Sequence, residues 1–166
     1  LADLLLREKK ELAQLISDEM GKRTEEATAE VEKCAACASY YAENAASLLA
    51  PLEVPTEAER SFVSFEPLGP VLAIMPWNFP LWQVVRCAAP ALSAGNTVVL
   101  KHASNVTGCA LALERIFRAA TGRENAFRAI LVPGKDALSL VARPEIAAVS
   151  LTGSTEVGRQ VAAVAG

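Results

Sequence analysis

Apolar residues recur at helical spacing along the first third of the chain. Residues 3–20 and residues 24–49 each place small and apolar side chains on one face, and Gly21 between them is a candidate C-cap. Residues 50–60 contain two prolines, and residues 61–65 alternate in polarity. The pattern therefore predicts two helices, then a connection, then a short strand.

The pattern changes at Gly69, where short apolar runs begin to alternate with longer amphipathic ones. The predicted strands are residues 70–75, 96–101, 126–132 and 146–153, and the helices that follow them are residues 80–94, 105–121, 135–144 and 154–165. Strands without polar alternation, each followed by a helix, are typical of a parallel sheet covered on both faces. We predict an α/β fold: a Rossmann-like doubly wound parallel sheet over 69–166, after N-terminal helices over 1–50 and a linker and strand over 51–68.

In such sheets, ligands bind outside the carboxyl ends of the strands. Three strand ends carry polar side chains, at Pro76–Asn78, Lys101–Ser104 and Thr152–Thr155. We therefore expect these three segments to lie near one crevice.

Charge and composition narrow the classes of partner. The chain is 52% hydrophobic, which favours a globular protein, and no apolar run reaches the length of a membrane span. Residues 1–66 hold 14 acidic and 7 basic side chains, whereas residues 67–166 hold 5 acidic and 9 basic ones. A mildly basic half suits a small anionic ligand but has no stripe of Lys and Arg for nucleic acid. We expect no nucleic-acid and no membrane partner.

The four cysteines include a CxxC formed by Cys34 and Cys37 in an Ala-rich helical run. Positions i and i+3 share a helix face, where free cysteines pack as small apolar side chains. A zinc site would need two more ligands, and the single histidine, His102, is distant in sequence. We expect no metal, no disulfide and a reducing cytoplasm.

The polar residues at the strand ends each allow more than one interpretation. Gly153 permits an unusual backbone angle, and Ser154 can cap a helix whose N-terminus attracts phosphate, although a capped helix without a ligand explains the same residues. Lys101 could hydrogen-bond a ribose or a phosphate, or could reach solvent at the sheet edge. Asn78 stands between aromatic rings and prolines, where its amide could stabilise an oxyanion or bond to the backbone.

Three stretches, EPLGPVLAIMPWNFP (66–80), PALSAGNTVVLKHASN (90–105) and LTGSTEVG (151–158), occur in an order that resembles the NAD(P)-dependent aldehyde dehydrogenase superfamily. EMGK (19–22) and YYAENA (40–45) are similar to its N-terminal helices. The resemblance covers almost the whole chain. PWNFPLWQ together with KHASN is most similar to the succinate-semialdehyde dehydrogenase branch.

The resemblance implies roles for the residues at the strand ends. Asn78 would donate a hydrogen bond to the oxyanion of a thiohemiacetal. The cofactor would be lined or held by Ile74, Met75, Pro76, Trp77, Lys101, Gly153 and Ser154, with Lys101 on the adenosine ribose and the last two on the pyrophosphate. Ser104 stands where NAD-preferring members often carry Glu, so the repulsion of a 2′-phosphate is lost. NAD or NADP is therefore the expected cofactor.

Some family features do not occur in this chain. Many members carry a second glycine after the position of Gly134, and the general-base glutamate and nucleophilic cysteine both follow the matched region; neither Cys87 nor Cys109 occupies that motif. We therefore expect an N-terminal fragment, inactive alone, of an enzyme that oxidises an aldehyde, with succinate semialdehyde one candidate, to a carboxylic acid. The complete protein is expected to be a homodimer or homotetramer.

Two other functions fit parts of the sequence. A truncated, non-catalytic nucleotide-binding or interaction module would bind NAD(P) without chemistry. Acyl-phosphate reduction on a related fold is a third hypothesis, which the intact PWNFP segment at 76–80 disfavours.

Overall fold

A computed structural model describes all 166 residues of the chain. The N-terminal region forms α1 (Ala2–Arg7), α2 (Lys9–Met20) and α3 (Thr24–Leu48). The helix predicted over 3–20 is thus broken at Glu8, which has φ −95° and ψ 15° and whose carboxylate pairs with Arg115. Gly21 ends α2 in the left-handed conformation at φ 75°, as the C-cap prediction required.

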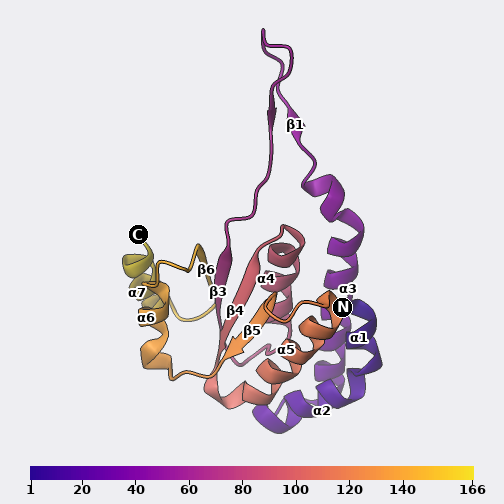
Figure 1. Cartoon of the computed structure of the whole chain (residues 1–166). Helices are drawn as coiled ribbons and strands as arrows, with labels where there is room; N and C mark the ends of the chain where they lie inside the picture. Colours follow the sequence, from indigo (N-terminus) through magenta and orange to yellow (C-terminus); the bar gives the residue numbers. More distant parts are fainter.

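A two-stranded arm follows α3 and extends away from the rest of the molecule (Figure 1). It pairs β1 (Leu52–Glu53) with β2 (Phe62–Val63) in antiparallel register. The strand predicted over 61–65 is therefore only two residues long. Its apolar residues are exposed, because the arm leaves the body before the main sheet begins.

The main sheet has four parallel strands in the order β5-β4-β3-β6. The strands are β3 (Pro70–Met75), β4 (Thr97–His102), β5 (Phe127–Ile130) and β6 (Ala148–Leu151). The crossovers contain α4 (Trp82–Ser93), η1 (Ser104–Val106) with α5 (Thr107–Thr121), η2 (Gly134–Asp136) with α6 (Ala137–Val141), and finally α7 (Thr155–Ala165) follows β6. The predicted doubly wound α/β fold is confirmed, and its strand order reverses between β3 and β6.

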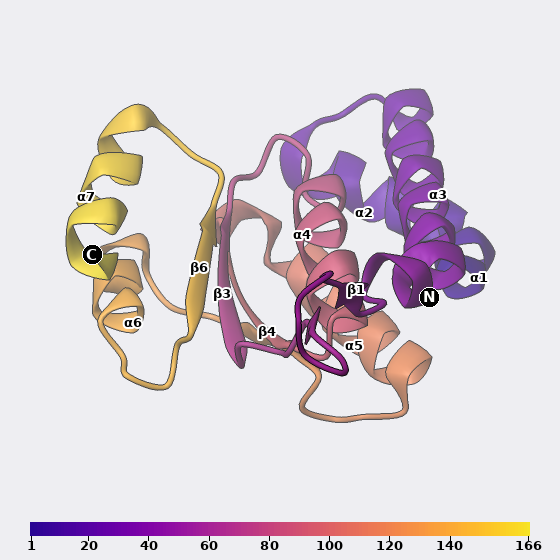
Figure 2. The same cartoon turned by 90° about the horizontal axis from the view of Figure 1, so that it is seen from above.

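The sheet separates two apolar cores of unequal size. In Figure 2, α4, α5 and the N-terminal helices cover one face, and α6 and α7 cover the other. Side chains of β3 point alternately into the two cores: Ala73 and Met75 lie in the large one, whereas Leu72 and Ile74 lie in the small one. Phe117 of α5 and Phe127 of β5 stack in the large core with ring centroids 4.4 Å apart. The two-sided burial explains why these strands show no polar alternation.

The cysteines are all free, and the two that are fully buried lie in the large core. Burial raises the pKa of the thiols of Cys34 and Cys109, so both stay protonated at neutral pH. No group of three or more His, Cys, Asp or Glu side chains lies close enough together to hold a metal ion. None of the helices has both the length and the apolar character needed to cross a bilayer.

Candidate functional site

A cleft of about 480 Å³ opens between the carboxyl ends of β3 and β6. Its lining consists of two tripeptides, Pro76-Trp77-Asn78 and Thr152-Gly153-Ser154. Because the strand order reverses between these two strands, the cleft lies at the topological switch point of the sheet, where doubly wound folds bind ligands. Two of the three strand ends that the sequence singled out therefore meet here.

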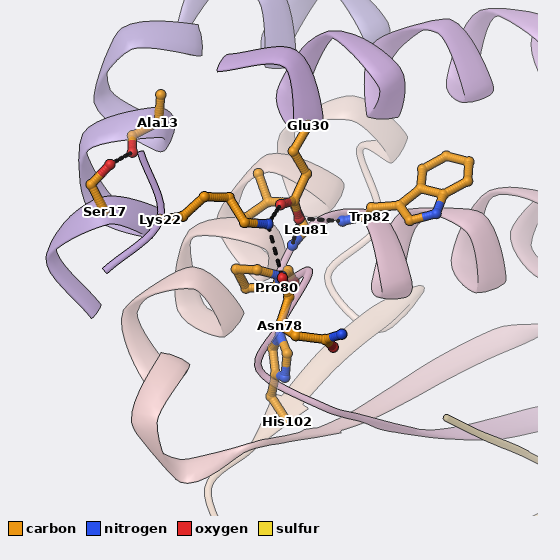
Figure 3. Close-up of polar contacts among 9 residues, drawn as sticks. All are labelled: Ala13, Ser17, Lys22, Glu30, Asn78, Pro80, Leu81, Trp82 and His102. Carbon is orange, nitrogen blue, oxygen red and sulfur yellow. Dashed lines mark hydrogen bonds and ion pairs between the residues drawn. The ribbon is translucent and has the colours of Figure 1, made fainter. Parts of the chain in front are cut away.

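Asn78 presents a free amide at this cleft. The residue is exposed, and in Figure 3 its side-chain amide points away from the polar network around its backbone. The hydrogen bond that Asn78 makes within the chain uses its backbone carbonyl oxygen, which accepts from Lys22 Nζ at 2.8 Å. The alternative of a buried asparagine bonded to the backbone is therefore wrong. A carboxamide N–H that is fixed at its backbone and unpaired at its tip suits donation to a ligand oxygen.

His102 connects the end of β4 to the Asn78 loop. The ring lies between two backbone carbonyls: Nε2 is 2.8 Å from the oxygen of Pro80, and Nδ1 is 3.2 Å from the oxygen of Met75 and 2.9 Å from the N–H of Ala103. A neutral ring donates from one nitrogen only, and the acceptor contact of Nδ1 with Ala103 favours donation from Nε2 to Pro80. Burial lowers the pKa of His102, which keeps the ring neutral at neutral pH.

The N-terminal helices hold the same loop from its other side. Glu30 of α3 is buried, and its Oε1 accepts from the N–H groups of Leu81 at 2.8 Å and Trp82 at 3.0 Å, where α4 begins. Lys22 pairs with Glu30 and also reaches the carbonyl of Asn78 (Figure 3). The loop that carries the candidate oxyanion donor is thus fixed by residues more than fifty positions earlier in the chain.

A cation lies at the rim of the cleft. Arg86, in the second turn of α4, is exposed, and its Nη2 donates to Thr152 Oγ1 at 3.1 Å. This contact ties the helix after Asn78 to the loop after β6. The guanidinium keeps donors in reserve, because a single hydroxyl uses only part of its fork.

Ser154 is the N-cap of α7, and its Oγ accepts from the N–H of Val157 at 3.3 Å. The start of α7 adjoins the cleft through Ser154, and the free N–H groups of a helix N-terminus favour an anion nearby. Gly153 does not adopt the unusual backbone angle that the sequence suggested, since the positive φ values fall on Gly21, Gly69, Gly95 and Gly122. A Cβ at Gly153 would meet only Leu151 Cδ1, at 3.7 Å, so the space beside the cleft is open.

A second cleft, of about 430 Å³, lies between the carboxyl ends of β4 and β5 and includes Ser104 and Gly134 in its lining. Lys101 is buried along its stem, and a Cβ added to Gly134 would lie 4.0 Å from Lys101 Nζ. The ion pairs of the chain do not include this amine, which retains access to solvent. A buried lysine whose amine ends unpaired beside a cleft fits an anionic or hydroxyl-bearing ligand.

The single crevice expected from the sequence is therefore two neighbouring clefts along one edge of the sheet. Pro76, Trp77, Asn78, Gly153 and Ser154 share the first, and Ser104 lines the second. Ile74 and Met75 are buried in the two cores and line neither cleft, so their contact with a cofactor stays a prediction.

Sequence reasoning missed three residues that shape the site: Lys22, Glu30 and Arg86. Two signals could have found the first pair, namely a lysine directly after a helix C-cap and a glutamate on the apolar face of α3. A charged residue at a core position needs a buried partner, which here is the start of α4.

We expect the imidazole of His102, the only histidine of the chain, to titrate below its usual pKa of 6.5 in the folded protein. The unfolded chain then binds the extra proton first as the pH falls. The contribution of His102 to the free energy of unfolding is complete above about pH 6.5. Below that pH it declines by at most about 1.4 kcal/mol per pH unit, until the folded pKa is reached. Proton NMR of the ring, in water and in urea, measures both values; a folded pKa at or above the urea value would contradict the assignment.

Comparison with known proteins places this geometry in a family. The sequence matches the aldehyde dehydrogenase family over residues 1–166, and the chain belongs to that family. It is 50% identical over 164 residues to a probable succinate-semialdehyde dehydrogenase [NADP(+)] of Synechocystis sp., which covers 99% of this chain and 36% of that protein. The succinate-semialdehyde dehydrogenase [NADP(+)] of Mycobacterium avium is 48% identical over 170 residues, with the same two coverages.

Solved structures agree with the sequence relatives. The succinic semialdehyde dehydrogenase of Streptococcus pyogenes, in complex with NADP+, superposes with a TM-score of 0.94 at 32% identity and covers 99% of this chain and 36% of that one. An NAD-dependent aldehyde dehydrogenase of Sinorhizobium meliloti gives 0.93 at 32% identity, covering 99% and 33%. The chain thus spans about a third of the length of the relatives that it matches.

Proposed function

We propose that the complete protein oxidises an aldehyde to a carboxylic acid with NADP+ or NAD+, and that the present chain supplies the oxyanion donor and much of the cofactor site. The observation that carries the proposal is the unpaired amide of Asn78 at the switch-point cleft, beside the N-terminus of α7. A donor fixed in advance at that place can stabilise negative charge that develops on a carbonyl oxygen.

The chemistry requires a nucleophile from elsewhere in the complete protein. A cysteine thiolate would add to the aldehyde carbon, and the carbonyl oxygen would take the negative charge and accept from the Asn78 amide. A bound nicotinamide would supply the acceptor for the hydride that leaves this carbon, and water would hydrolyse the resulting thioester and release the cysteine. The four thiols of this chain are poor candidates, because Cys34 and Cys109 are buried with raised pKa values and none of the four lines the Asn78 cleft.

The two clefts suit a dinucleotide phosphate as cofactor. The N-terminus of α7 would meet the pyrophosphate, Trp77 and Pro76 would border the nicotinamide side, and the amine of Lys101 would hydrogen-bond the adenosine ribose. Ser104 is exposed in the second cleft and carries no charge, so it leaves room for a 2′-phosphate. NADP+ is the cofactor that this arrangement favours, in keeping with the names of the relatives from Synechocystis and Mycobacterium avium.

Arg86 supports a substrate that carries a carboxylate as well as its aldehyde, such as succinate semialdehyde. Its guanidinium lies at the rim of the Asn78 cleft with donors to spare, and a carboxylate is the natural partner of that planar fork. The aldehyde carbon would then lie toward Asn78 and the carboxylate toward α4. The relatives named succinate-semialdehyde dehydrogenase agree with this choice.

We expect the complete protein to reduce NADP+ with succinate semialdehyde and to prefer this substrate to a neutral aldehyde of equal chain length. Arg86→Met should lower kcat/KM for the semialdehyde by about 10- to 100-fold, the worth of a charge-assisted hydrogen bond, and leave the neutral aldehyde within about threefold. Absorbance of the reduced nicotinamide gives both rates. Binding of NADP+ without turnover of any aldehyde would instead favour the non-catalytic nucleotide-binding module.

The assembly of the complete protein is also part of the proposal. The arm formed by β1 and β2 exposes Leu52, Phe62, Val63 and Phe65 and has few partners within the chain, which supports a homodimer or homotetramer in which it packs on another subunit. The free cysteines support a reducing cytoplasm as the location.

A further inference from the structure

The Asn78 loop is held by a buried ion pair that lies outside both clefts. Lys22 Nζ makes three contacts at once: it pairs with the Glu30 carboxylate, donates to the carbonyl oxygen of Asn78 at 2.8 Å, and lies 3.9 Å above the centroid of the Phe79 ring. The side chains of Lys22 and Glu30 are only 8% and 1% exposed, so neither charge is screened by bulk water.

The other half of the pair fixes the start of α4. Glu30 Oε1 accepts from the two backbone N–H groups at Leu81 and Trp82, and Leu81, the N-cap residue, offers no side-chain cap of its own. Glu30 therefore acts as the cap of a helix that is distant in sequence, and its charge also favours the positive end of the helix dipole. One Lys–Glu unit thus fixes the Asn78 carbonyl, which precedes Pro80, and the α4 amides, which follow it (Figure 3).

The bonds of this unit go to the backbone, which leaves the tip of Asn78 unoccupied. His102 supplies a third anchor at the Pro80 carbonyl, so the backbone is held at Asn78, at Pro80 and at the start of α4. An oxyanion donor works only if it is held within about 0.5 Å of its productive position before the reaction. A loop whose backbone is held by these hydrogen bonds has that property, whereas an exposed five-residue loop without them would not.

We propose that Lys22 and Glu30 are positioning residues that aim the Asn78 amide at the developing oxyanion. The inference rests on the proposed function, because it takes Asn78 to be the oxyanion donor. Lys22 and Glu30 themselves touch neither substrate nor cofactor. Their action runs through the backbone of residues 78–82. A purely structural ion pair would stabilise the fold without any dependence on Asn78.

The first test is a double-mutant cycle on kcat in the complete protein. Lys22→Met should lower kcat by about 10- to 100-fold, less than the loss of the donor itself, while NADP+ affinity stays unchanged. In an Asn78→Ala background the same change should cost less than about threefold, because the residue through which Lys22 acts is gone. An equal loss of kcat in both backgrounds would overturn the inference.

Conservative variants guard against a protein that does not fold. Lys22→Arg keeps the charge and Glu30→Gln keeps an acceptor for the two α4 amides, so each should retain more activity than Lys22→Met. The matched control is Lys9→Met, which breaks the Lys9–Glu32 pair between α2 and α3 but does not reach the Asn78 loop. This control should leave kcat unchanged; a comparable loss from it would also contradict the inference.

The second test does not depend on catalysis. Hydrogen exchange of the complete protein should show faster exchange of the Leu81 and Trp82 amides by about tenfold or more in Glu30→Ala, which removes their acceptor, and in Lys22→Met, and no change in Lys9→Met. If these amides respond but no aldehyde is oxidised, the proposed function fails and the anchoring of the loop stands. If the enzyme is active but exchange and kcat are insensitive to Lys22, the inference fails and the function stands.

Discussion

Replacing Asn78 by alanine is expected to lower kcat for aldehyde oxidation in the complete protein by about 10²–10³-fold, the usual effect of removing one oxyanion donor. The amide makes no hydrogen bond within the chain that would be lost, and the residue is exposed, so the fold should keep its stability. The Asn78 carbonyl that Lys22 holds is backbone and survives the substitution.

The loss should fall on kcat and kcat/KM together. The amide bonds to charge that exists only once the thiolate has added, so it stabilises the transition state and not the bound aldehyde. Asn78→Asp should be at least as damaging as Asn78→Ala, because the isosteric carboxylate removes the donor and adds a negative charge beside the oxyanion. Steady-state kinetics at saturating NADP+ measures both variants.

Asn44→Ala is the matched control for this series. Its amide lies on the exposed side of α3 and donates to the Tyr40 carbonyl at 2.8 Å, far in sequence from the cleft. Wild-type kinetics are expected. An Asn78→Ala enzyme within about threefold of wild type would remove Asn78 from the machinery, since a true oxyanion donor is worth far more.

Ser104→Glu is expected to turn the preference for NADP+ toward NAD+. The new carboxylate would face the 2′-phosphate across the second cleft; two like charges about 5–6 Å apart near a surface repel by about 1.5–3 kcal/mol, or about 10- to 100-fold in the ratio of affinities. With NAD+ the same carboxylate can accept from the free ribose 2′-OH. Calorimetric titration with each dinucleotide measures this ratio without any need for turnover.

Ser104→Gln separates charge from size. Glutamine has the shape of glutamate but is neutral, so it should shift the ratio by only a few fold, and the two variants together isolate the electrostatic part. Because the Ser104 side chain is exposed and only its carbonyl is used, by Thr107, the fold should tolerate both. An unchanged NADP+ to NAD+ ratio in Ser104→Glu would show that this position does not read the 2′-phosphate.

Hydrophobic patterning was most accurate where burial is two-sided. The strand predicted over 70–75 is β3 to the residue, and β4 differs from its prediction by one position at each end. These strands are central in the sheet, where both faces are buried, so the ends of the apolar run in the sequence mark the ends of the strand. The edge strands β5 and β6 are shorter than predicted. In the sequence, apolar residues beyond the last paired residue look the same as residues of the strand.

Local pattern failed where a contact distant in sequence intervenes. The N-terminal helix is interrupted at Glu8, whose partner Arg115 lies on α5, and no periodicity within residues 3–20 marks that break. The sequence allowed Gly153 an unusual backbone angle, yet Gly153 is not among the glycines with positive φ. The arm likewise depends on what it pairs with and not on its own alternation.

The sequence alone determined the class of fold, and it predicted a site at the carboxyl edge of the sheet with Asn78, Lys101, Ser104 and Ser154 as its polar groups. Periodicity and strand ends are local properties, and they survive without coordinates. Only the tertiary structure decided that the strand ends divide between two clefts and that Lys22, Glu30 and His102 hold the Asn78 loop. Those contacts join residues 22 to 56 positions apart, a separation at which side-chain spacing carries no information about which groups will meet.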